Sequence, residues 1–576
     1  MFLLPSHRHK AHSVRQGNLY PKPNTQVLGL HINKTKFLKL IFLNVDCPLY
    51  CKSSLLKRQR ANDKKLKNSQ LWIVFYNYTK IQLIYIIDLY INSHYSICLK
   101  NNLRKNNLKL PLSIEEINDI VEKNYNNKYD KITAFIKDSE ISNVFIKDKS
   151  VKVSPKVIRY IIGEYLNLKE ILRLDNVDNI GYSLDNNSFR EALEKIYIAS
   201  KKDNKTKNIL YPYCIFASNE QINNLYKEAK EIASSRSKYA SFMFEAIALN
   251  GTKTALNLVY EASKKLKQKT VRFTCKAILN LIAKEIGAHV EVFADKIIPD
   301  FDFDKDGIRI VEAENKKFKI TLKNDFSISI FDEEKNKEFK NFPKDFPEND
   351  KKELSKLKSE INRVLKIQTE RLQYVFLDGR KWSFEDWKEI FFNNPLMKDF
   401  AIKLIWGVYD KKNKLLKTFR YMEDGSFNNE DDEEIKLEDK NLIGLISPIE
   451  INRKITEKWQ RQLNDYEIVQ PFNQLSTKTK KELIKKIPSV VTALTIRGLA
   501  SKLCLETEYG DGGFIYGYYL FDTYNEAYLE ILTSGIFYGA YNDEEINIKI
   551  NFRNADERFE YGAYLILSNY LKWYIK

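Results

Sequence analysis

The spacing of apolar residues changes once along this chain, near residue 300, and the change restricts the folds open to it. Between residues 111 and 295, segments such as "LSIEEINDIVEKNY" and "TKTALNLVYEASKKLKQ" carry apolar groups three or four residues apart, a period typical of amphipathic helices. From residue 296, segments such as "GIRIVEAENKKFKITLKNDFSISIFDEEKNKEF" alternate apolar and polar residues, which indicates antiparallel strands. The sequence therefore predicts a helical region followed by a mixed one.

The helical segments favour a stacked α-solenoid of HEAT-like helix pairs, although they show no strict repeat period. Ser113 and Ser188 are predicted to cap helices, since each is followed three residues later by a glutamate. Gly251 and Gly287 are predicted to end helices. Such stacks usually present a concave surface to a partner, so the pattern indicates protein–protein interaction.

The second half predicts an α+β domain, because strands and helices follow each other without βαβ regularity. A long helix is expected from about Lys351 to Phe376, with Ser383 and Pro395 opening the next two helices. A further helix is expected over residues 489–503. With 576 residues the chain is too long for one core. We predict a leader over residues 1–110, a helical region over 111–295 and an α+β domain over 296–576.

The net charge of +18 lies almost entirely in the leader. Residues 1–110 hold 19 Lys and Arg but only three acids, Asp46, Asp63 and Asp88, which leaves a net +2 for the remaining 466 residues. Binding to nucleic acid through counterion release needs a clustered excess of cations. The sequence therefore predicts such binding, if any, only through the basic leader.

The leader has two interpretations. Leu71–Ile91 is long enough to span a membrane, but Lys80 and Asp88 within it make insertion costly, so no membrane association is expected. The other interpretation is an irregular segment that precedes an authentic start near residue 110. Cys214, Cys275 and Cys504 stand alone in the rest of the chain, a pattern that favours a reducing, cytoplasmic location.

One stretch, "LLKTFRYMEDGSFNNEDDEE", is predicted to form a hairpin. Asp424-Gly425 after a strand-like run is a strong turn signal. The acidic string behind it lacks the glycine and alternating oxygen ligands of a calcium loop, and we expect a solvated tip. Arg420 and Glu423 flank the turn and are expected to form a bidentate pair that locks the hairpin.

A second acidic stretch, "DFDFDKDG", is a weak candidate for a divalent cation. Asp302, Asp304, Asp306 and Gly307 match the first half of an EF-hand loop. The twelfth position, which should be a bidentate acid, is Ala313. We therefore expect a connector between helix and strand here, and predict no other metal or cofactor.

Two aromatic and glycine-rich stretches lie near the end of the chain. "YGDGGF" lacks the lysine and helix start of a phosphate-binding loop, so a tight turn is expected. The run "FIYGYYLF" is predicted to be a strand, with half of its rings facing a core. The other rings are expected to line a neighbouring sheet, and the alternative for them is base stacking.

Several classes of enzyme are excluded by what the sequence lacks. After residue 94 the only histidine is His289, which excludes a histidine-dependent triad or a multi-histidine metal site. Neither a Gly-x-Ser-x-Gly motif nor a dinucleotide fingerprint is present. If the protein is an enzyme, the candidate catalytic residues are Arg420, Glu423, Asp465 and Glu467.

Five ordered motifs carry a family resemblance: "IGAHVEVFADKIIPDFDFDKDG", "RKWSFEDWKEIFFNNPLMKDFAIKLIWGVYD", "KTFRYMEDGSF", "IGLISPIEI" and "NDYEIVQPFNQL". Together they resemble the bacterial domain of unknown function 4132, the MolR-like family, over roughly residues 235–576. The family pattern falls on Trp382, Trp406, Gly407, Arg420, Glu423, Asp424, Gly425, Pro448, Trp459, Asp465, Tyr466, Glu467, Gln470, Pro471 and Phe472.

The resemblance implies a regulator rather than a reaction. Members are described as regulators linked to molybdate metabolism, and some resemble components encoded beside MoxR-class AAA+ ATPases and von Willebrand A proteins. Two departures stand out, because the chain has no Trp-Gly-Arg module and carries Ser447-Pro448 where His-Pro is expected.

These observations leave three hypotheses. The first is a non-catalytic cytoplasmic scaffold or regulatory adaptor that works with an AAA+ ATPase system. The second is an uncharacterised enzyme that depends on the four candidate residues named above. The third is a nucleic-acid-associated transcriptional regulator that uses the basic leader.

Overall fold

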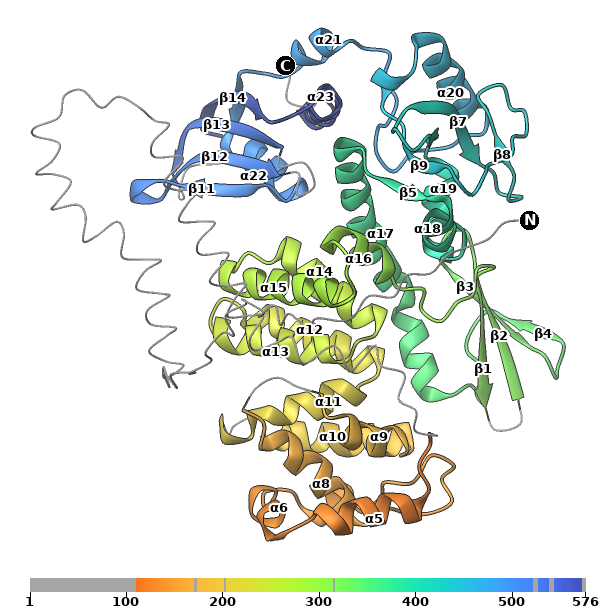
Figure 1. Cartoon of the computed structure of the whole chain (residues 1–576), viewed down its shortest axis with the longest axis vertical. Coiled ribbons are helices and arrows are strands. Elements are labelled where there is room, and N and C mark those ends of the chain that lie inside the picture. Colours follow the sequence, from red (N-terminus) through yellow and green to blue (C-terminus); the bar gives the residue numbers. More distant parts are fainter. Residues whose placement is uncertain are drawn as a thin grey trace, which may run out of the picture. The chain divides into compact units, whose positions relative to one another are not determined.

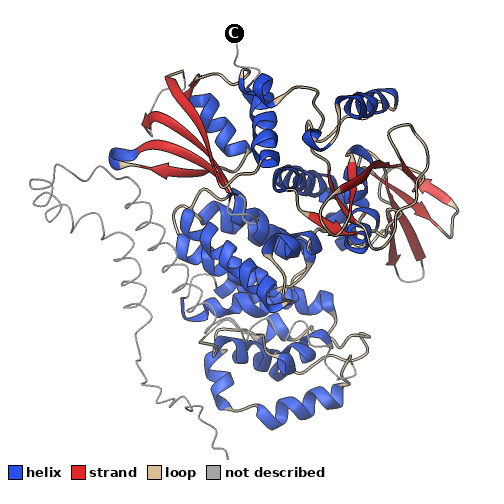
Figure 2. Cartoon of the chain, turned by 45° about the horizontal axis from the view of Figure 1, so that its top comes forward, coloured by secondary structure: helices blue, strands red, loops and turns tan. Residues whose placement is uncertain are grey.

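The computed structural model describes residues 110–169, 173–200, 204–313, 316–521, 527–537 and 543–571 (Figure 1). Helices fill the described chain up to residue 296, and the named strands begin at residue 308 (Figure 2). The described part thus has a helical first region and a later region with antiparallel sheets, as the change in apolar spacing predicts. The domain boundaries given above stay predictions.

Local side-chain signals start and end many helices of the first region. Ser113 caps the first of them in a capping box with Glu116, and Gly251 and Gly287 follow helix ends with φ of 74° and 68°. The helices are α5 (Ile114–Asn124), α6 (Asn127–Ile132), α7 (Asp138–Ile141), α8 (Pro155–Leu166), α9 (Asp175–Tyr182), α10 (Asn186–Ser200), the 3-10 helix η1 (Asn204–Ile209), α11 (Leu210–Phe216), α12 (Asn219–Ile232), α13 (Ser237–Leu249), α14 (Lys253–Lys265), α15 (Lys269–Glu285) and α16 (Val290–Lys296).

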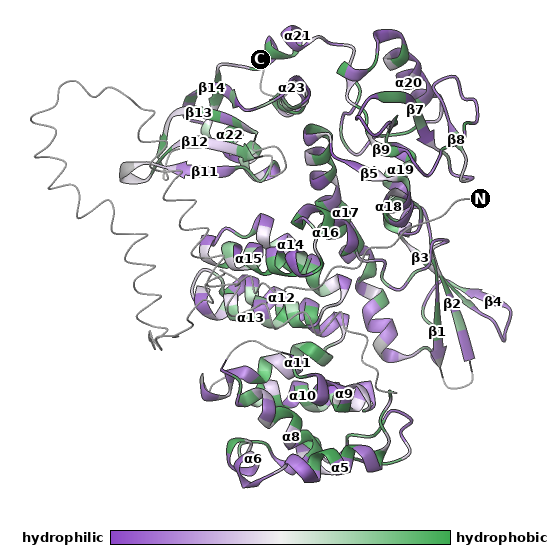
Figure 3. Ribbon diagram, in the orientation of Figure 1, coloured by the Kyte–Doolittle hydropathy of each residue, from purple (hydrophilic) through white to green (hydrophobic). Residues whose placement is uncertain are grey.

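One continuous apolar core runs through these helices. Met243, Phe244 and Leu258 are fully buried, and every residue of α11 is buried, in keeping with its mostly hydrophobic colouring in Figure 3. Each large apolar side chain contributes about 1.5–3 kcal/mol through burial. The packing explains a stable helical region, while the HEAT-like repeat type stays a prediction.

The first sheet is the antiparallel meander expected from the alternating pattern. Its order is β1-β2-β3-β4, and Phe318 and Ile320 turn to the buried face. The long predicted helix follows it and ends at Gly379 with φ of 67°. The elements are β1 (Ile308–Ala313), β2 (Lys316–Leu322), β3 (Ile328–Asp332), β4 (Lys337–Phe339) and α17 (Glu348–Asp378).

The second sheet has the order β5-β9-β6-β7-β8, with antiparallel neighbours throughout. Its central strands are buried, and Trp406 lies opposite Phe419. The elements are β5 (Lys381–Ser383), α18 (Phe384–Trp387), the π-helix η2 (Lys388–Phe392), α19 (Pro395–Lys403), β6 (Trp406–Tyr409), β7 (Leu415–Tyr421), β8 (Phe427–Asn428), β9 (Leu442–Leu445), the 3-10 helix η3 (Pro448–Glu450), α20 (Arg453–Asp465) and α21 (Lys480–Ile484).

The third sheet has the order β10-β14-β13-β12-β11 and carries helices on one face (Figure 2). Phe552 of this sheet packs against Phe559 and Tyr564 of the last helix. The elements are β10 (Val490–Thr492), α22 (Ala493–Lys502), β11 (Glu506–Tyr509), the 3-10 turn η4 (Asp511–Gly513), β12 (Phe514–Phe521), β13 (Tyr528–Phe537), β14 (Glu545–Arg553) and α23 (Glu557–Leu571). The tight turn expected at "YGDGGF" is confirmed.

Two predicted helix starts are wrong. Helix α10 begins at Asn186, because the Asp185 carboxylate accepts the backbone N–H of Ser188 at 2.9 Å and takes the capping role expected of Ser188. The helix expected from residue 489 begins at Ala493, after Thr492 as its cap. The preceding β-branched residues pair with β14 as a short strand.

Within the part of the chain that the structure describes, no helix combines the length and the apolar character needed to cross a membrane. Leu71–Ile91 and the rest of the predicted leader up to residue 109 lie outside the described residues. The interpretations of that segment stay predictions.

Candidate functional site

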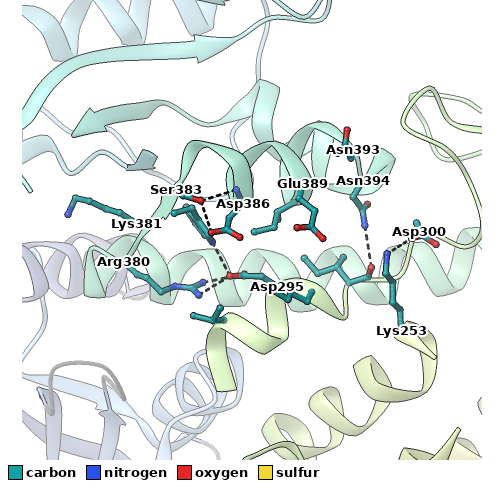
Figure 4. Close-up of a pocket in the computed structure, with 15 residues that line it drawn as sticks. Lys253, Asp295, Asp300, Arg380, Lys381, Ser383, Asp386, Glu389, Asn393 and Asn394 are labelled. Atoms are coloured by element: carbon teal, nitrogen blue, oxygen red, sulfur yellow. Dashed lines mark hydrogen bonds and ion pairs between the residues drawn. The ribbon is translucent and has the colours of Figure 1, made fainter. Parts of the chain in front are cut away.

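A cavity of about 320 Å³ lies where α16 meets the segment from β5 to the start of α19 (Figure 4). About half of its lining residues are charged, and both signs are present. The lining residues are Lys253, Val292, Asp295, Lys296, Ile298, Asp300, Arg380, Lys381, Trp382, Ser383, Asp386, Glu389, Ile390, Asn393 and Asn394.

Caps on two short helices hold one wall of this cavity. The Ser383 hydroxyl accepts the backbone N–H of Asp386 at 3.1 Å, which starts α18 as predicted. Asn394 starts α19 before Pro395, and its Nδ2 donates to the carbonyl oxygens of Ile298 and Pro299 at 3.3 and 3.4 Å. Asn394 therefore joins the two walls through the backbone.

At the base of the cavity a buried carboxylate binds two guanidinium groups and an indole. Arg371 donates from Nη1 to Oδ1 of Asp295. Arg380 donates from Nη1 to Oδ2 at 2.8 Å and from Nη2 to Oδ1 at 3.3 Å, and Trp382 donates from Nε1 to Oδ2 at 2.9 Å. The side chains of Asp295 and Arg371 are 2% exposed and that of Arg380 is 4% exposed.

This cluster keeps Arg380 charged as well as in position. Burial by itself lowers the pKa of Arg380, but the charge of Asp295 and its hydrogen bonds raise that pKa overall. The Asp295 oxygens already accept four hydrogen bonds, which leaves them little capacity to accept another from a substrate. The geometry is therefore that of an internal clamp between α16 and the α17–β5 segment.

A half-buried ion pair joins α14 to α16 near this clamp. Lys264 donates from Nζ to Oε1 of Glu291 at 2.9 Å, and the Tyr260 hydroxyl donates to Oε2 at 2.9 Å. The Glu291 side chain is 17% exposed. Burial alone raises the pKa of Glu291, but the Lys264 ammonium and these hydrogen bonds lower it to about 2.

Replacement of Glu291 by glutamine is expected to flatten the stability profile in acid. The folded pKa lies below the unfolded value of about 4.3, so the ionised carboxylate contributes its full stabilisation, up to about 3 kcal/mol, above pH 5. That contribution disappears as the pH falls toward 2. Urea denaturation at steps between pH 6 and 2 measures this, with the exposed Glu385→Gln as control. Parallel profiles for wild type and Glu291→Gln contradict it.

The upper part of the cavity presents free charge to solvent. Asp386 and Glu389 are exposed on one wall, and Lys253 pairs with Asp300 at 2.6 Å on the other (Figure 4). The Lys381 side chain turns away from these groups, and its Nζ donates to the carbonyl oxygen of Gly379 at 3.0 Å. Burial, together with the charge of Arg558, lowers the pKa of Lys381. The cavity thus has charged side chains of both signs at its rim. At its floor lies Asp295, whose carboxylate oxygens already accept hydrogen bonds.

The predicted hairpin forms, with Gly425 at φ of 92° in its turn, but the expected Arg420–Glu423 pair does not appear among the described ion pairs. The Arg420 side chain is buried beneath Tyr466, with its guanidinium carbon 4.4 Å from the ring centroid. Its Nε donates to Oε1 of Gln462 at 3.0 Å. Arg420 therefore ties the hairpin to α20.

The acidic string behind the hairpin is exposed, but two of its carboxylates bind neighbouring side chains. Lys458 donates to both oxygens of Asp431 at 2.6 and 2.7 Å, and the Tyr466 hydroxyl donates to Asp432 at 2.7 Å. Asp432 in turn accepts from Asn428 at 3.0 Å. The solvated tip predicted from the sequence thus has basic and phenolic partners on α20, which the sequence pattern did not reveal because these lie 27 and 34 residues later.

The candidate catalytic residues lie apart from the cavity. Glu423, Asp465 and Glu467 are exposed, and none of them, nor Arg420, lines the cavity. No described hydrogen bond or ion pair joins Arg420 to the three carboxylates. The structure thus brings Arg420 to Tyr466, a neighbour in the family pattern, but not to the acids.

The other residues of the family pattern serve mainly the core. Trp406 donates from Nε1 to the carbonyl oxygen of Ala401 at 2.9 Å, and Trp459 donates to Oγ1 of Thr418 at 3.0 Å. Gly407 lets the Leu415 side chain pack close to the backbone of β6, because a Cβ at residue 407 would lie 2.7 Å from that side chain. The pattern residues that are also buried are Trp382, Pro448 and Phe472, and those that are half-buried are Gln470 and Pro471. The Asp424 carboxylate accepts the backbone N–H of Ser426 in the hairpin turn.

The EF-hand-like acids do not gather around a common point. Asp304 accepts the backbone N–H groups of Asp306 and Ile308 at 2.9 and 2.8 Å, as in a turn. Asp302 lies 3.9 Å from Arg309. Among the described residues no group of three or more His, Cys, Asp or Glu side chains has the arrangement of a metal site.

Comparison with known proteins finds similarity for part of the chain. The family model described as "Domain of unknown function (DUF4132)" matches residues 337–482. "Uncharacterized protein YehI" of Escherichia coli (strain K12) is 28% identical over 242 residues, which are 40% of this chain and 20% of that relative. The match thus spans about one fifth of the relative's length. No solved structure matches the chain.

The match supports the predicted resemblance to the domain of unknown function 4132 family over residues 337–482. It includes Arg371, Arg380 and Trp382, three of the four residues in the clamp, whereas Asp295 lies before it. The MolR-like assignment and the wider range predicted for it stay predictions. Sequence reasoning missed Asp295, Arg371 and Arg380, because no spacing rule connects an aspartate to partners more than 70 residues later.

Proposed function

We propose that this protein is a non-catalytic interaction protein, a scaffold or regulatory adaptor. One observation carries the proposal: the buried charged side chains of the clamp and of the hairpin are held by other groups of the fold. Asp295 is bound by two guanidinium groups, and Arg420 lies beneath Tyr466. A general acid or base must be free to exchange a proton with substrate. These groups instead hold separate segments of the chain together.

The mixed-charge rim of the cavity is the surface proposed to meet the partner. Charges arranged on a fixed surface select a partner by complementarity and suppress wrong ones. Glu389 and Asp386 offer negative charge to a basic segment of a partner, while Lys253 and Asp300 are already paired. The helical region, taken as a HEAT-like solenoid, adds a long surface to the same role.

The partner class follows from the family resemblance. We propose a cytoplasmic protein partner, a MoxR-class AAA+ ATPase or a von Willebrand A protein, and a regulatory role beside it. The description of the matched family and the name of the E. coli relative assign no activity. The partner is therefore the first thing to be measured.

Affinity purification of the tagged full chain from its own cells, with mass spectrometry and a tally of stoichiometry, tests the proposal. We expect one abundant partner with the wild type and with Glu385→Arg, an exposed change on α18 outside the cavity lining. Glu389→Arg should reduce recovery of that partner at least about fivefold, roughly 1 kcal/mol of binding free energy.

Two results contradict this proposal. Equal recovery with all three proteins excludes the cavity rim as the contact surface. A retained small molecule without any stoichiometric protein favours the enzyme hypothesis instead. Thermal unfolding of each variant should match the wild type, which separates a lost contact from a lost fold.

A further inference from the structure

The third sheet has one covered face and one open face, and strand register assigns each side chain to one of them. Residues directly opposite each other in paired strands point to the same face. Tyr518 and Ile531, an opposed pair, are buried together with Ile546. Tyr519 and Glu530, the next pair, therefore belong to the opposite face.

Aromatic side chains gather on the open face in two groups. Phe514, Tyr516 and Phe537 are 37%, 44% and 48% exposed, and the ring centroids of Phe514 and Phe537 lie 5.4 Å apart across β12 and β13. Tyr519 and Tyr528 form the second group with Phe521, at centroid distances of 5.4 to 6.1 Å. Of the five rings in the "FIYGYYLF" run only that of Tyr518 is buried, so fewer rings face the core than the predicted half.

A polar and cationic row lies beside the rings on the same face. Lys549 lies opposite Leu532, and Arg553 lies opposite Tyr528, with its guanidinium carbon 5.8 Å from the Tyr528 ring centroid. Asn551 lies opposite Glu530, and alternation along β14 adds Asn547. Amides and cations thus line the strand next to the ring-bearing strands.

Two carboxylates on this face, those of Glu508 and Glu530, accept hydrogen bonds from neighbouring groups. Tyr519 donates its hydroxyl to Glu508 and, at 3.1 Å, to Oε1 of Glu530. Asn551 donates to Oε2 of Glu530 at 3.1 Å, and Glu530 is only 8% exposed. Lys549 and Arg553 are both exposed. Glu508 and Glu545 on the same face are exposed as well, so Lys549 and Arg553 lie beside the rings on a face that carries charge of both signs.

We propose that this open face binds single-stranded nucleic acid, with bases stacked on the rings of β12 and β13 and phosphates along Lys549 and Arg553. Rings on adjacent antiparallel strands stack bases in RNA-recognition sheets, and neighbouring cations neutralise the backbone. Stacking needs exposed ring faces and phosphates need cations, and this face supplies both within neighbouring strands. The proposal is independent of the partner proposed above and of the basic leader.

Fluorescence anisotropy of the full chain with labelled oligouridylate and oligodeoxythymidylate of about 12 nucleotides tests this surface. Tyr516→Ala and Phe537→Ala should each weaken binding about five- to hundredfold, the range for loss of one stacked base. Lys549→Glu should weaken it and reduce the salt dependence. Leu416→Ala and Lys412→Glu, exposed changes on the second sheet and its hairpin loop, serve as matched controls and should leave the affinity unchanged.

The basic leader can bind the same probe by charge alone, so the contact must also be located. Photo-crosslinking with 5-bromouracil in the oligonucleotide, followed by peptide mapping, should mark peptides within residues 514–537. Crosslinks confined to residues 1–110, unchanged affinity in both ring variants, or no binding of either probe would overturn the proposal.

Discussion

Asp295→Asn is expected to lower the free energy of unfolding by about 3–5 kcal/mol. The asparagine keeps the shape of the side chain but removes its charge, and the guanidinium groups of Arg371 and Arg380 then lie buried without a counter-ion. An unpaired buried cation loses its hydration without compensation. Urea denaturation followed by tryptophan fluorescence reports on this site directly, because Trp382 donates to the same carboxylate.

Asp300→Asn is the matched control for that change. Asp300 also pairs with a basic side chain, Lys253 at 2.6 Å, but the two side chains are 31% and 51% exposed. A solvated pair contributes about 1 kcal/mol or less. Equal losses for Asp295→Asn and Asp300→Asn would show that the buried cluster is not a structural clamp.

Trp387→Ala is expected to cost a similar amount, about 3–5 kcal/mol, through loss of buried area and formation of a cavity. Trp387 is fully buried, and its ring lies within 6.3 Å, centroid to centroid, of the rings of Phe384, Phe391, Trp406 and Phe419. It packs α18 against the second sheet, and so sets the position of the cavity wall. Thermal or urea denaturation measures the loss.

Trp387→Phe separates packing from polar contacts at the same position. The indole Nε1 has no hydrogen-bond partner among the described residues, so phenylalanine removes a buried donor while it keeps an aromatic ring. We expect this variant to lose clearly less stability than Trp387→Ala. A loss as large as that of the alanine variant would mean that the shape of the indole, rather than the ring contacts, holds this core together.

Apolar spacing and local caps determined the order of elements. Alternation over residues 308–339 predicted the meander, and the capping box at Ser113 and the Asp424-Gly425 turn formed as expected. These signals act over a few residues, so a single sequence contains them in full. The predicted start of α10 was wrong because two possible caps, Asp185 and Ser188, stand close together. The carboxylate of Asp185 accepts the backbone N–H of Ser188 and takes the capping role.

Candidate sites were harder to predict than elements. The sequence predicted that Arg420 pairs with Glu423, three residues away. In the fold, Arg420 instead donates a hydrogen bond to Gln462 and lies against the ring of Tyr466. It also predicted only a solvated tip for the acidic string, whereas Lys458 binds Asp431. Opposite charges pair with whichever partner packing brings near, and proximity along the chain is a poor guide to that.

The sequence by itself determined that helices come first, that antiparallel strands follow, that the described region holds a single histidine, His289, and that the motifs resemble a family of unknown function. These follow from residue types and short-range spacing. Only the tertiary structure decided that Asp295 meets Arg371, Arg380 and Trp382, and that rings and cations share one open face of the third sheet. Contacts between segments 70 or more residues apart depend on how the elements pack, and register on a sheet depends on strand pairing that no local pattern encodes.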